Sequence, residues 1–118
     1  MKTSNMKKAG KNTQAPSREK IISILKKELP HLREKYGVER IALYGSFAKG
    51  TQKKTSDVDI LVDIRRPIGM EFISLANMLE DKLGRKVDIA TLSHYKRSLG
   101  NPRYKQIAED IGKSMIYV

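Results

Sequence analysis

The sequence predicts one small α/β domain of the α+β kind, in which a mixed β-sheet is flanked by helices. Three observations predict this fold. Short runs of branched apolar residues, typical of buried strands, alternate with longer stretches whose apolar residues recur at helical spacing. No internal repeat is present. The chain has 118 residues, enough for one hydrophobic core and too few for two, so we expect a single folded unit over residues 17–118.

The chain begins with a polar and basic segment, residues 1–16, which lacks apolar periodicity and is predicted to be a disordered tail. A helix is expected from Ser17, whose hydroxyl can cap it, and Glu19 places a negative charge in the first turn, where it suits the helix dipole. Pro30 is expected to break this helix or to begin a new first turn, and Gly37 is expected to end it. The apolar residues that recur at helical spacing are Ile21, Ile22, Leu25, Leu29, Leu32 and Tyr36.

Three segments predict the strands. Residues 38–44 are branched and apolar toward their end, which is typical of a strand buried on both faces, and residues 45–56 form a loop with two glycines and three lysines. Residues 57–64 alternate, and residues 86–92 predict a third strand. In the alternating strand, Val58, Ile60, Val62 and Ile64 face one way, and Asp57, Asp59, Leu61 and Asp63 face the other.

Two further helices are expected. Residues 70–83 carry an apolar stripe and end at Gly84, and a last helix opens at residues 101–102. Residues 115–118 are apolar enough to form a short edge strand or a docked terminus. The stripe of the first helix comprises Phe72, Ala76, Leu79 and Leu83, and the shared face of the second comprises Tyr104, Ile107, Ala108 and Ile111.

The composition narrows the classes of function. The 24 basic residues outnumber the 13 acidic ones and give a net charge of +11, which attracts phosphate groups. Nucleic acid is a possible partner but is not favoured, because the chain has no Trp and few aromatic residues to stack on bases. The absence of cysteine excludes disulfides, thiolate metal ligands and cysteine nucleophiles, and it fits a cytoplasmic location. No membrane span or signal peptide is predicted, because no apolar run is long enough.

Three carboxylates form the candidate site. Asp57 and Asp59 stand two residues apart on one strand, so both side chains project from the same face, about 7 Å apart at the backbone. Carboxylate oxygens are the ligands that Mg²⁺ prefers, and the opposite face of the strand is apolar and can be anchored in the core. Asp88 lies within an apolar strand, where an unpaired carboxylate is costly to bury. Beside the other two it would supply a third metal ligand and help to deprotonate an incoming hydroxyl.

A glycine and a serine open the loop before these acids. The backbone at Gly45 can approach a phosphate closely, and Ser46 adds a hydroxyl. Each signal also has a purely structural interpretation: Gly-Ser is commonly a turn, the aspartates with Asp63 can form a solvated face, and Asp88 can pair with a basic residue. His31 and His94 follow no ligand spacing and are expected at the surface. The presence of the glycine-serine pair and the three aspartates together favours a metal and phosphate site over these structural interpretations.

The run GSFAKGTQKKTSDVDILV resembles the motif of the polymerase-β-type nucleotidyltransferase superfamily, in which Gly-Ser is followed by ten residues and then by Asp-x-Asp. Tyr44 ends an apolar strand just before the glycine, Gly50 recurs in the loop, and Asp88 falls in a later strand, where this superfamily keeps its third carboxylate. The resemblance covers residues 17–118. The short length is similar to the minimal nucleotidyltransferases, many of which are MntA-type antitoxins that consist of the catalytic palm alone.

This resemblance implies a palm-like fold and transfer of AMP from ATP to a tyrosine of a HEPN-domain toxin, which silences the toxin. It implies that two Mg²⁺ ions are bound by Asp57, Asp59 and Asp88, which are also the catalytic residues. The implied nucleotide-binding residues are Gly45, Ser46, Phe47, Lys49, Lys53 and Lys54. Relatives often carry arginine at two of these loop positions, where this chain has Phe47 and Lys49, and a lysine neutralises phosphate as a point charge rather than through a bidentate fork.

Two alternatives remain open at this stage. A nucleotidyltransferase of this size can have another acceptor, either an RNA end or a small molecule such as an aminoglycoside, although the chain lacks the additional domain that such enzymes use to hold the acceptor. A non-catalytic module that neutralises a toxin by occupying it is the other alternative. The presence of all three predicted metal ligands, Asp57, Asp59 and Asp88, favours an active enzyme.

Overall fold

The computed structural model describes residues 16–65 and 68–118, and it confirms a mixed sheet flanked by helices. Of the predicted tail, residues 1–15 lie outside the described residues. The strands are β2 (Val38–Tyr44), β3 (Val58–Ile64), β4 (Val87–Thr91) and β5 (Ile116–Tyr117). The helices are α1 (Arg18–Tyr36), α2 (Gly45–Lys49), α3 (Glu71–Leu83), α4 (Leu92–Leu99) and α5 (Lys105–Ser114).

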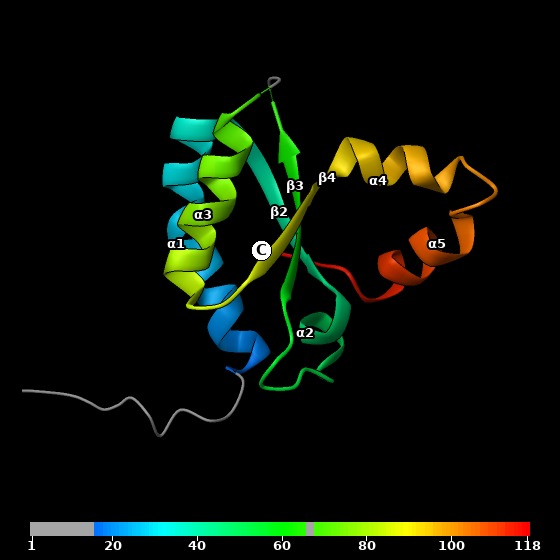
Figure 1. Ribbon diagram of the computed structural model, residues 1–118, viewed down its shortest axis with the longest axis horizontal. Coiled ribbons are helices and arrows are strands. Elements are labelled where there is room, and N and C mark those ends of the chain that lie inside the picture. The colour runs from blue at the N-terminus through cyan, green and yellow to red at the C-terminus, as the bar shows by residue number, and fades with distance from the viewer. Residues whose placement is uncertain (1–15, 66–67) are drawn as a thin grey trace, which may run out of the picture.

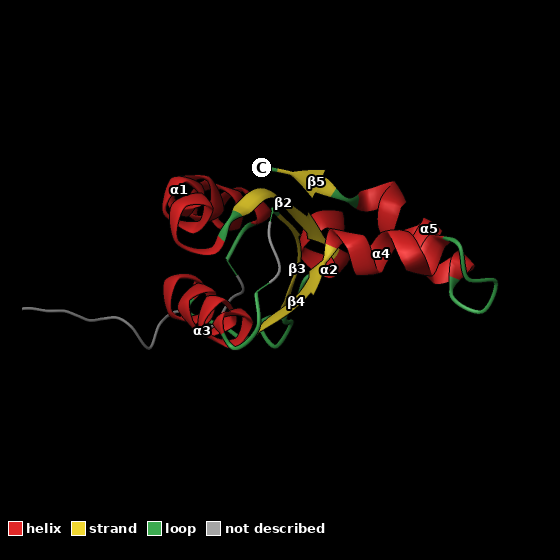
Figure 2. Ribbon diagram, turned by 90° about the horizontal axis from the view of Figure 1, so that it is seen from above, coloured by secondary structure: helices red, strands yellow, loops and turns green. Residues whose placement is uncertain are grey.

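The sheet separates two layers of helices. Its strand order is β4-β3-β2-β5, with β2 antiparallel to β3 and β5, and with β3 parallel to β4. Helices α1 and α3 lie side by side on one face, and α4 and α5 lie on the other, with α2 near one end of the strands (Figures 1 and 2). The main core lies between the sheet and the layer of α1 and α3. One face of the central strands is therefore anchored in the main core, and the opposite face bears α4 and α5.

Helix α1 begins and ends where the sequence predicts. The Ser17 hydroxyl accepts a hydrogen bond from the backbone N–H of Lys20 at 3.1 Å, and Gly37 ends the helix with φ of 74°. The expected break at Pro30 is wrong, because α1 continues through it. Proline removes one backbone donor, but Leu25 on one side of it and Leu32 on the other are both fully buried in the same core, so packing outweighs the lost hydrogen bond.

The central strand β3 presents two chemically different faces, as predicted. Val58, Ile60 and Val62 are fully buried against the main core. Leu61 on the opposite face is also buried, because α4 and α5 cover that part of the sheet. The predicted stripe of α3 is wrong in part: its fully or nearly fully buried residues are Leu75, Leu79 and Leu83, whereas Phe72 and Ala76 are only partly buried.

Two helices lie where no helix was predicted. The predicted loop 45–56 begins with α2, whose five residues are too few to show a periodic pattern. Helix α4 follows β4 directly, and Thr91 caps it by accepting from the His94 N–H at 3.2 Å. Only Leu92 of this helix is buried, although Leu92, Tyr95 and Leu99 stand at helical spacing, a signal that the sequence analysis missed.

The C-terminal prediction is confirmed as an edge strand, because β5 pairs with β2. The last helix, α5, begins at Lys105 rather than at residue 101. His31 and His94 are both exposed, as expected. Within the two described ranges, none of the helices has the length and apolar character that crossing a membrane would require.

Candidate active site

The sheet aligns three of the site side chains in one row. Tyr44 on β2 lies opposite Asp59 on β3, and Asp59 lies opposite Asp88 on β4. Residues in register on neighbouring strands point to the same face, so all three side chains lie on the face that bears α4 and α5. Asp57 comes just before β3 and is exposed, as is Asp88, while Asp59 is partly buried at the centre of the group.

The row concentrates negative charge on Asp59. Burial, together with the neighbouring charges of Asp88 and Asp57, raises the pKa of the Asp59 carboxyl from 3.8 to about 6, and burial is the largest of these causes. Asp88 lies opposite Asp59 in the register of β3 and β4, and Asp57 precedes Asp59 by two residues, so both acids are neighbours of Asp59. The structure therefore brings together the three acids that the sequence singles out, with Asp59 between the others.

Tyr44 belongs to this group, although the sequence analysis assigns it no role beyond ending a strand. Burial, together with the charges of Asp59 and Asp88, raises the pKa of its hydroxyl to about 12, and burial is the largest of these causes. The phenol therefore stays protonated beside the carboxylates. Only the strand register reveals this proximity, because 15 and 44 residues of chain separate Tyr44 from the two acids.

Gly45 is packed directly against the central acid. A Cβ atom at this position would lie 2.1 Å from Oδ2 of Asp59, a distance at which no side chain fits. The glycine also has φ of 73°, in the left-handed region that glycine adopts without strain. The Gly-Ser turn thus serves the site in a specific way: it lets the backbone that follows β2 pass beside the carboxylate.

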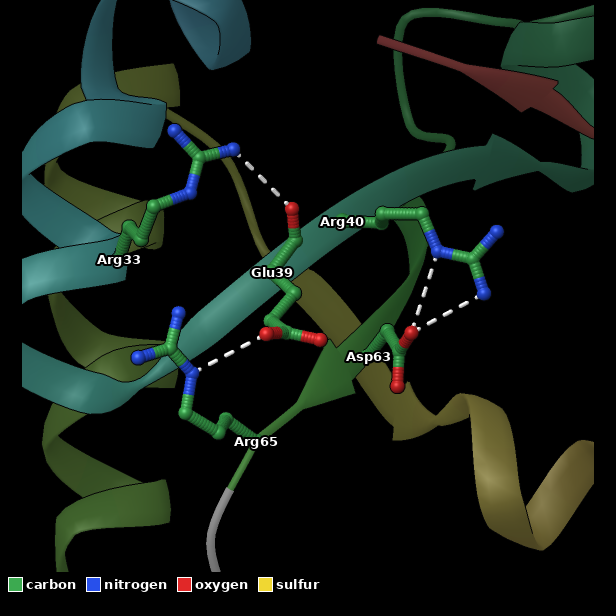
Figure 3. Close-up of polar contacts among 5 residues, drawn as sticks. All are labelled: Arg33, Glu39, Arg40, Asp63 and Arg65. Atoms are coloured by element: carbon green, nitrogen blue, oxygen red, sulfur yellow. Dashed lines mark hydrogen bonds and ion pairs between the residues drawn. The ribbon is translucent and has the colours of Figure 1, made fainter.

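The remaining acid on this face of β3 has a different environment. Asp63 accepts two hydrogen bonds from Arg40, at 3.0 and 3.1 Å, and a second pair joins Arg65 to Glu39 nearby (Figure 3). Asp63 is therefore neutralised by a partner, as expected of an ordinary sheet surface. Asp57, Asp59 and Asp88 form no such ion pair with any basic residue of the described ranges, 16–65 and 68–118.

The predicted nucleotide-binding residues lie around the same turn. Ser46 is partly buried at the start of α2, and Lys49, Lys53 and Lys54 are exposed on α2 and the following loop. The side chain of Phe47 is fully buried in the main core, so only its backbone is available to a ligand.

Arg85 is a residue that the sequence analysis missed. Its guanidinium donates to the carbonyl oxygens of Ser56, at 3.2 Å, and of Lys54, and it lies 5.6 Å from the centre of the Phe47 ring. It therefore joins the loop that leads into Asp57 to the helix that follows Gly45. Its partners lie about thirty residues away in the sequence, so no local pattern could have identified it.

The chemistry of the acids fits a divalent cation. Carboxylate oxygens are hard ligands, and a cation would relieve the repulsion that raises the pKa of Asp59. Among residues 16–65 and 68–118, no group of three or more His, Asp or Glu side chains is arranged so that it could hold a metal ion. The shared metal site of Asp57, Asp59 and Asp88 thus stays a prediction.

Comparison with known proteins identifies relatives along nearly the whole chain. The chain is 44% identical over 99 residues to a Methanocaldococcus jannaschii protein that is provisionally named a protein adenylyltransferase. The aligned region covers 83% of this chain and 94% of the relative. It is 39% identical over 101 residues to the protein adenylyltransferase MntA of Thermococcus cleftensis, which covers 85% of this chain and 94% of the relative.

A solved structure supports the same assignment. The fold resembles that of a provisionally named minimal nucleotidyltransferase with a TM-score of 0.62 and 26% identity, over 86% of this chain and 95% of the other. The family model described as a nucleotidyltransferase domain matches residues 19–117. This match includes β3 and β4, the strands that bear the acids, and the turn at Gly45 that precedes β3, and the chain therefore belongs to the nucleotidyltransferase domain family.

Proposed function

We propose that this chain is a protein adenylyltransferase that transfers AMP from ATP to a hydroxyl group of a partner protein. The observation that carries the proposal is the placement of Asp59 in register with Asp88 and in direct contact range of the Gly45 backbone. A glycine turn beside clustered carboxylates suits a triphosphate whose charge is neutralised by cations. The names of the two relatives, both protein adenylyltransferases, support the choice of a protein acceptor.

The proposed reaction is a substitution at the α-phosphorus of ATP. The acceptor oxygen forms a bond to this phosphorus, the bond from phosphorus to the bridging oxygen of pyrophosphate breaks, and the hydroxyl proton passes to a base. Asp88 is the proposed base, because it is exposed at the end of the row and lies opposite Asp59 in the strand register. The backbone at Gly45 and the hydroxyl of Ser46 would bind the departing phosphates, with Lys49, Lys53 or Lys54 neutralising their charge.

Mg²⁺ is the proposed cofactor, as two ions held by Asp57, Asp59 and Asp88. When bound, it would stabilise the charge on the attacking and leaving oxygens. The chain's own contribution is to fix two of these ligands on adjacent parallel strands and the third just before one of them. Sites on strands hold their ligands more precisely than sites on loops.

The proposed acceptor is a tyrosine of a HEPN-type ribonuclease toxin, and the proposed role of this chain is that of its antitoxin. The support is the resemblance to the minimal nucleotidyltransferases together with the 39% identity to a relative named MntA. The net charge of +11 is compatible with ATP and with an acidic partner surface.

The first test is label transfer from α-labelled ATP. The purified chain is incubated with Mg²⁺, the labelled ATP and the product of the neighbouring reading frame, with total RNA in a parallel reaction. We expect label on the protein, and we expect Asp57→Asn to abolish it without unfolding the domain, because the substitution relieves charge crowding. Label on RNA would indicate a different acceptor, and a tight unlabelled complex would indicate a binding module; either result would overturn the proposal.

The second prediction concerns Asp59 and pH. Because the folded state raises the pKa of this carboxyl from 3.8 to about 6, the folded chain binds its proton more tightly than the unfolded chain does. The free energy of unfolding should therefore fall as pH rises from about 4 to about 6, and it should stay lower above that range. Asp59→Asn should remove this decrease and raise the melting temperature at pH 7 without divalent cations by a few degrees.

Added Mg²⁺ should stabilise the wild-type chain at pH 7 and leave Asp59→Asn unchanged. Thermal unfolding at several pH values, in EDTA and in Mg²⁺, measures both effects. Asp63→Asn is the control, since Asp63 is already neutralised by Arg40. If Asp63→Asn changed the pH and Mg²⁺ dependence of the melting temperature as much as Asp59→Asn, the effect would not come from charge crowding at Asp59.

The third prediction compares two glycines. Gly45 and Gly50 have φ values of 73° and 77°, so alanine is similarly strained at both, but only at Gly45 would its Cβ collide with Asp59. We expect Gly45→Ala to lower the rate of AMP transfer about a hundredfold, because it displaces the central carboxylate. Gly50→Ala should lower the rate of AMP transfer far less. Steady-state transfer rates of both variants, with circular dichroism to verify folding, provide the comparison.

The fourth prediction concerns Arg85. If its hydrogen bonds hold the loop before Asp57, then Arg85→Ala should raise the Mg²⁺ concentration for half-maximal transfer about tenfold, with activity recovering at high Mg²⁺. Arg85→Lys should recover only part of this loss, since an ammonium cannot reproduce the planar fork. Arg65→Ala is the matched control, because Arg65 pairs with Glu39 instead. Equal Mg²⁺ dependence in Arg85→Ala and Arg65→Ala would rule out this role.

A further inference from the structure

A groove of about 550 Å³ lies between the sheet and the two helices that cover this part of it, α4 and α5. Its floor consists of Tyr44, Leu61 and Ala90, one residue from each of three adjacent strands. Its walls come from the two helices and the segment that joins them, and the helices project together from one side of the molecule (Figure 1).

The walls of the groove are held together by specific contacts. The Tyr95 hydroxyl of α4 donates to the carbonyl oxygen of Ala108 on α5 at 3.0 Å. A Cβ atom at Gly112 would lie 2.6 Å from the same hydroxyl oxygen, so the two helices meet closely there. The groove is therefore an existing feature that a ligand can enter without first separating the helices.

The groove is continuous with the row of acids. Leu61 follows Asp59 by two residues on β3, and Ala90 follows Asp88 by two residues on β4, so these side chains are the next ones along the same face. Tyr44 belongs to both the row and the groove. The turn at Gly45 and the loop that precedes β3 lie at the other end of the row, where the strands β3 and β4 begin.

This order has a chemical consequence for the proposed reaction. In an in-line substitution at phosphorus, the attacking oxygen approaches from the side opposite the leaving pyrophosphate. With the departing phosphates at the turn of Gly45 and Ser46 and the α-phosphate at the acids, the attacking hydroxyl must come from the side on which the groove lies.

The lining of the groove indicates the chemistry of its ligand. The floor is apolar, and the exposed side chains of Tyr104 and Ile107, 46% and 62% accessible, extend the apolar surface beyond it. Arg97 also lines the groove, and Lys96, Arg103 and Lys105 lie next to lining residues in the sequence and are exposed. None of these four basic residues forms an ion pair within the described part of the chain.

We propose that this groove binds the acceptor polypeptide: the tyrosine to be modified lies on the floor of Leu61 and Ala90, and acidic residues beside it face Arg97 and its basic neighbours. The proposal rests on the proposed adenylyltransferase function and adds the place and character of the acceptor segment. An aromatic side chain fits an apolar floor next to the acids, and acidic flanking residues complement the uncompensated positive charge.

A peptide experiment tests the binding site directly. The probe is the acetylated, amidated peptide Glu-Asp-Tyr-Leu-Glu, and the version with Phe in place of Tyr is the non-reactive probe. Methyl and amide NMR signals of the chain are followed during titration. We expect both peptides to shift the signals of Leu61, Ala90 and Ile107, and a peptide with Lys in place of each acid to shift them much less.

Variants then connect binding to transfer. Ile107→Glu places a negative charge at the groove and should lower kcat/KM for AMP transfer to the tyrosine peptide about tenfold. Ile73→Glu is the matched control, because Ile73 is 55% exposed on α3, on the other face of the sheet. Neither variant should change the affinity for ATP with Mg²⁺.

The outcomes separate this proposal from the proposed function. Transfer to the partner protein that is unaffected by Ile107→Glu would overturn the groove and leave the function intact. If the peptide shifted the NMR signals of Leu61 and Ala90 but the chain transferred no AMP, the groove would stand as a peptide-binding site and the proposed adenylyltransferase function would be wrong. Shifts of the same signals by adenosine alone, with loss of peptide binding, would show that the groove holds the nucleoside and would overturn the proposal.

Discussion

The site depends on one crowded contact, the carboxylate of Asp59 held between the backbone of Gly45 and the neighbouring acid Asp88. Each part of the contact is unfavourable when considered alone, since burial and like charges both raise the pKa of Asp59. The surrounding strands hold it in place because their other faces are fixed in the core. Stability that the fold gains from apolar packing is thus partly offset at the site, as is common where function requires a strained arrangement.

The two faces of β3 differ in chemistry, and this difference explains how the fold tolerates the crowded contact at Asp59. Val58, Ile60 and Val62 pack under α1 and α3, and the carboxylates alternate with them on the opposite side. At the far end of the strand, Asp63 lies on the same face as the other carboxylates, but it is neutralised by Arg40. The chain therefore compensates acids where they serve only the surface and leaves them uncompensated where a cation and a nucleotide are expected.

Much of this arrangement was predictable from local sequence. The period-two pattern of residues 57–64 identified the strand and its two faces, and Ser17 and Gly37 identified the ends of α1. What could not be predicted depended on distant contacts: α1 continues through Pro30 because residues on both sides of it enter one core. Arg85 could not be found either, since its importance lies in the carbonyl groups of Lys54 and Ser56 on a separate loop.

Because β3 and β4 pair in parallel, insertions and deletions have different effects before and after the start of β4. Helix α3 and its flanking turns can gain or lose residues without moving Asp88, provided that β4 returns to the same position beside β3. A single insertion or deletion between the start of β4 and Asp88 would instead rotate that side chain to the opposite face of the sheet. Length variation among relatives should therefore accumulate before Val87, and Asp88 should stay the residue directly after it.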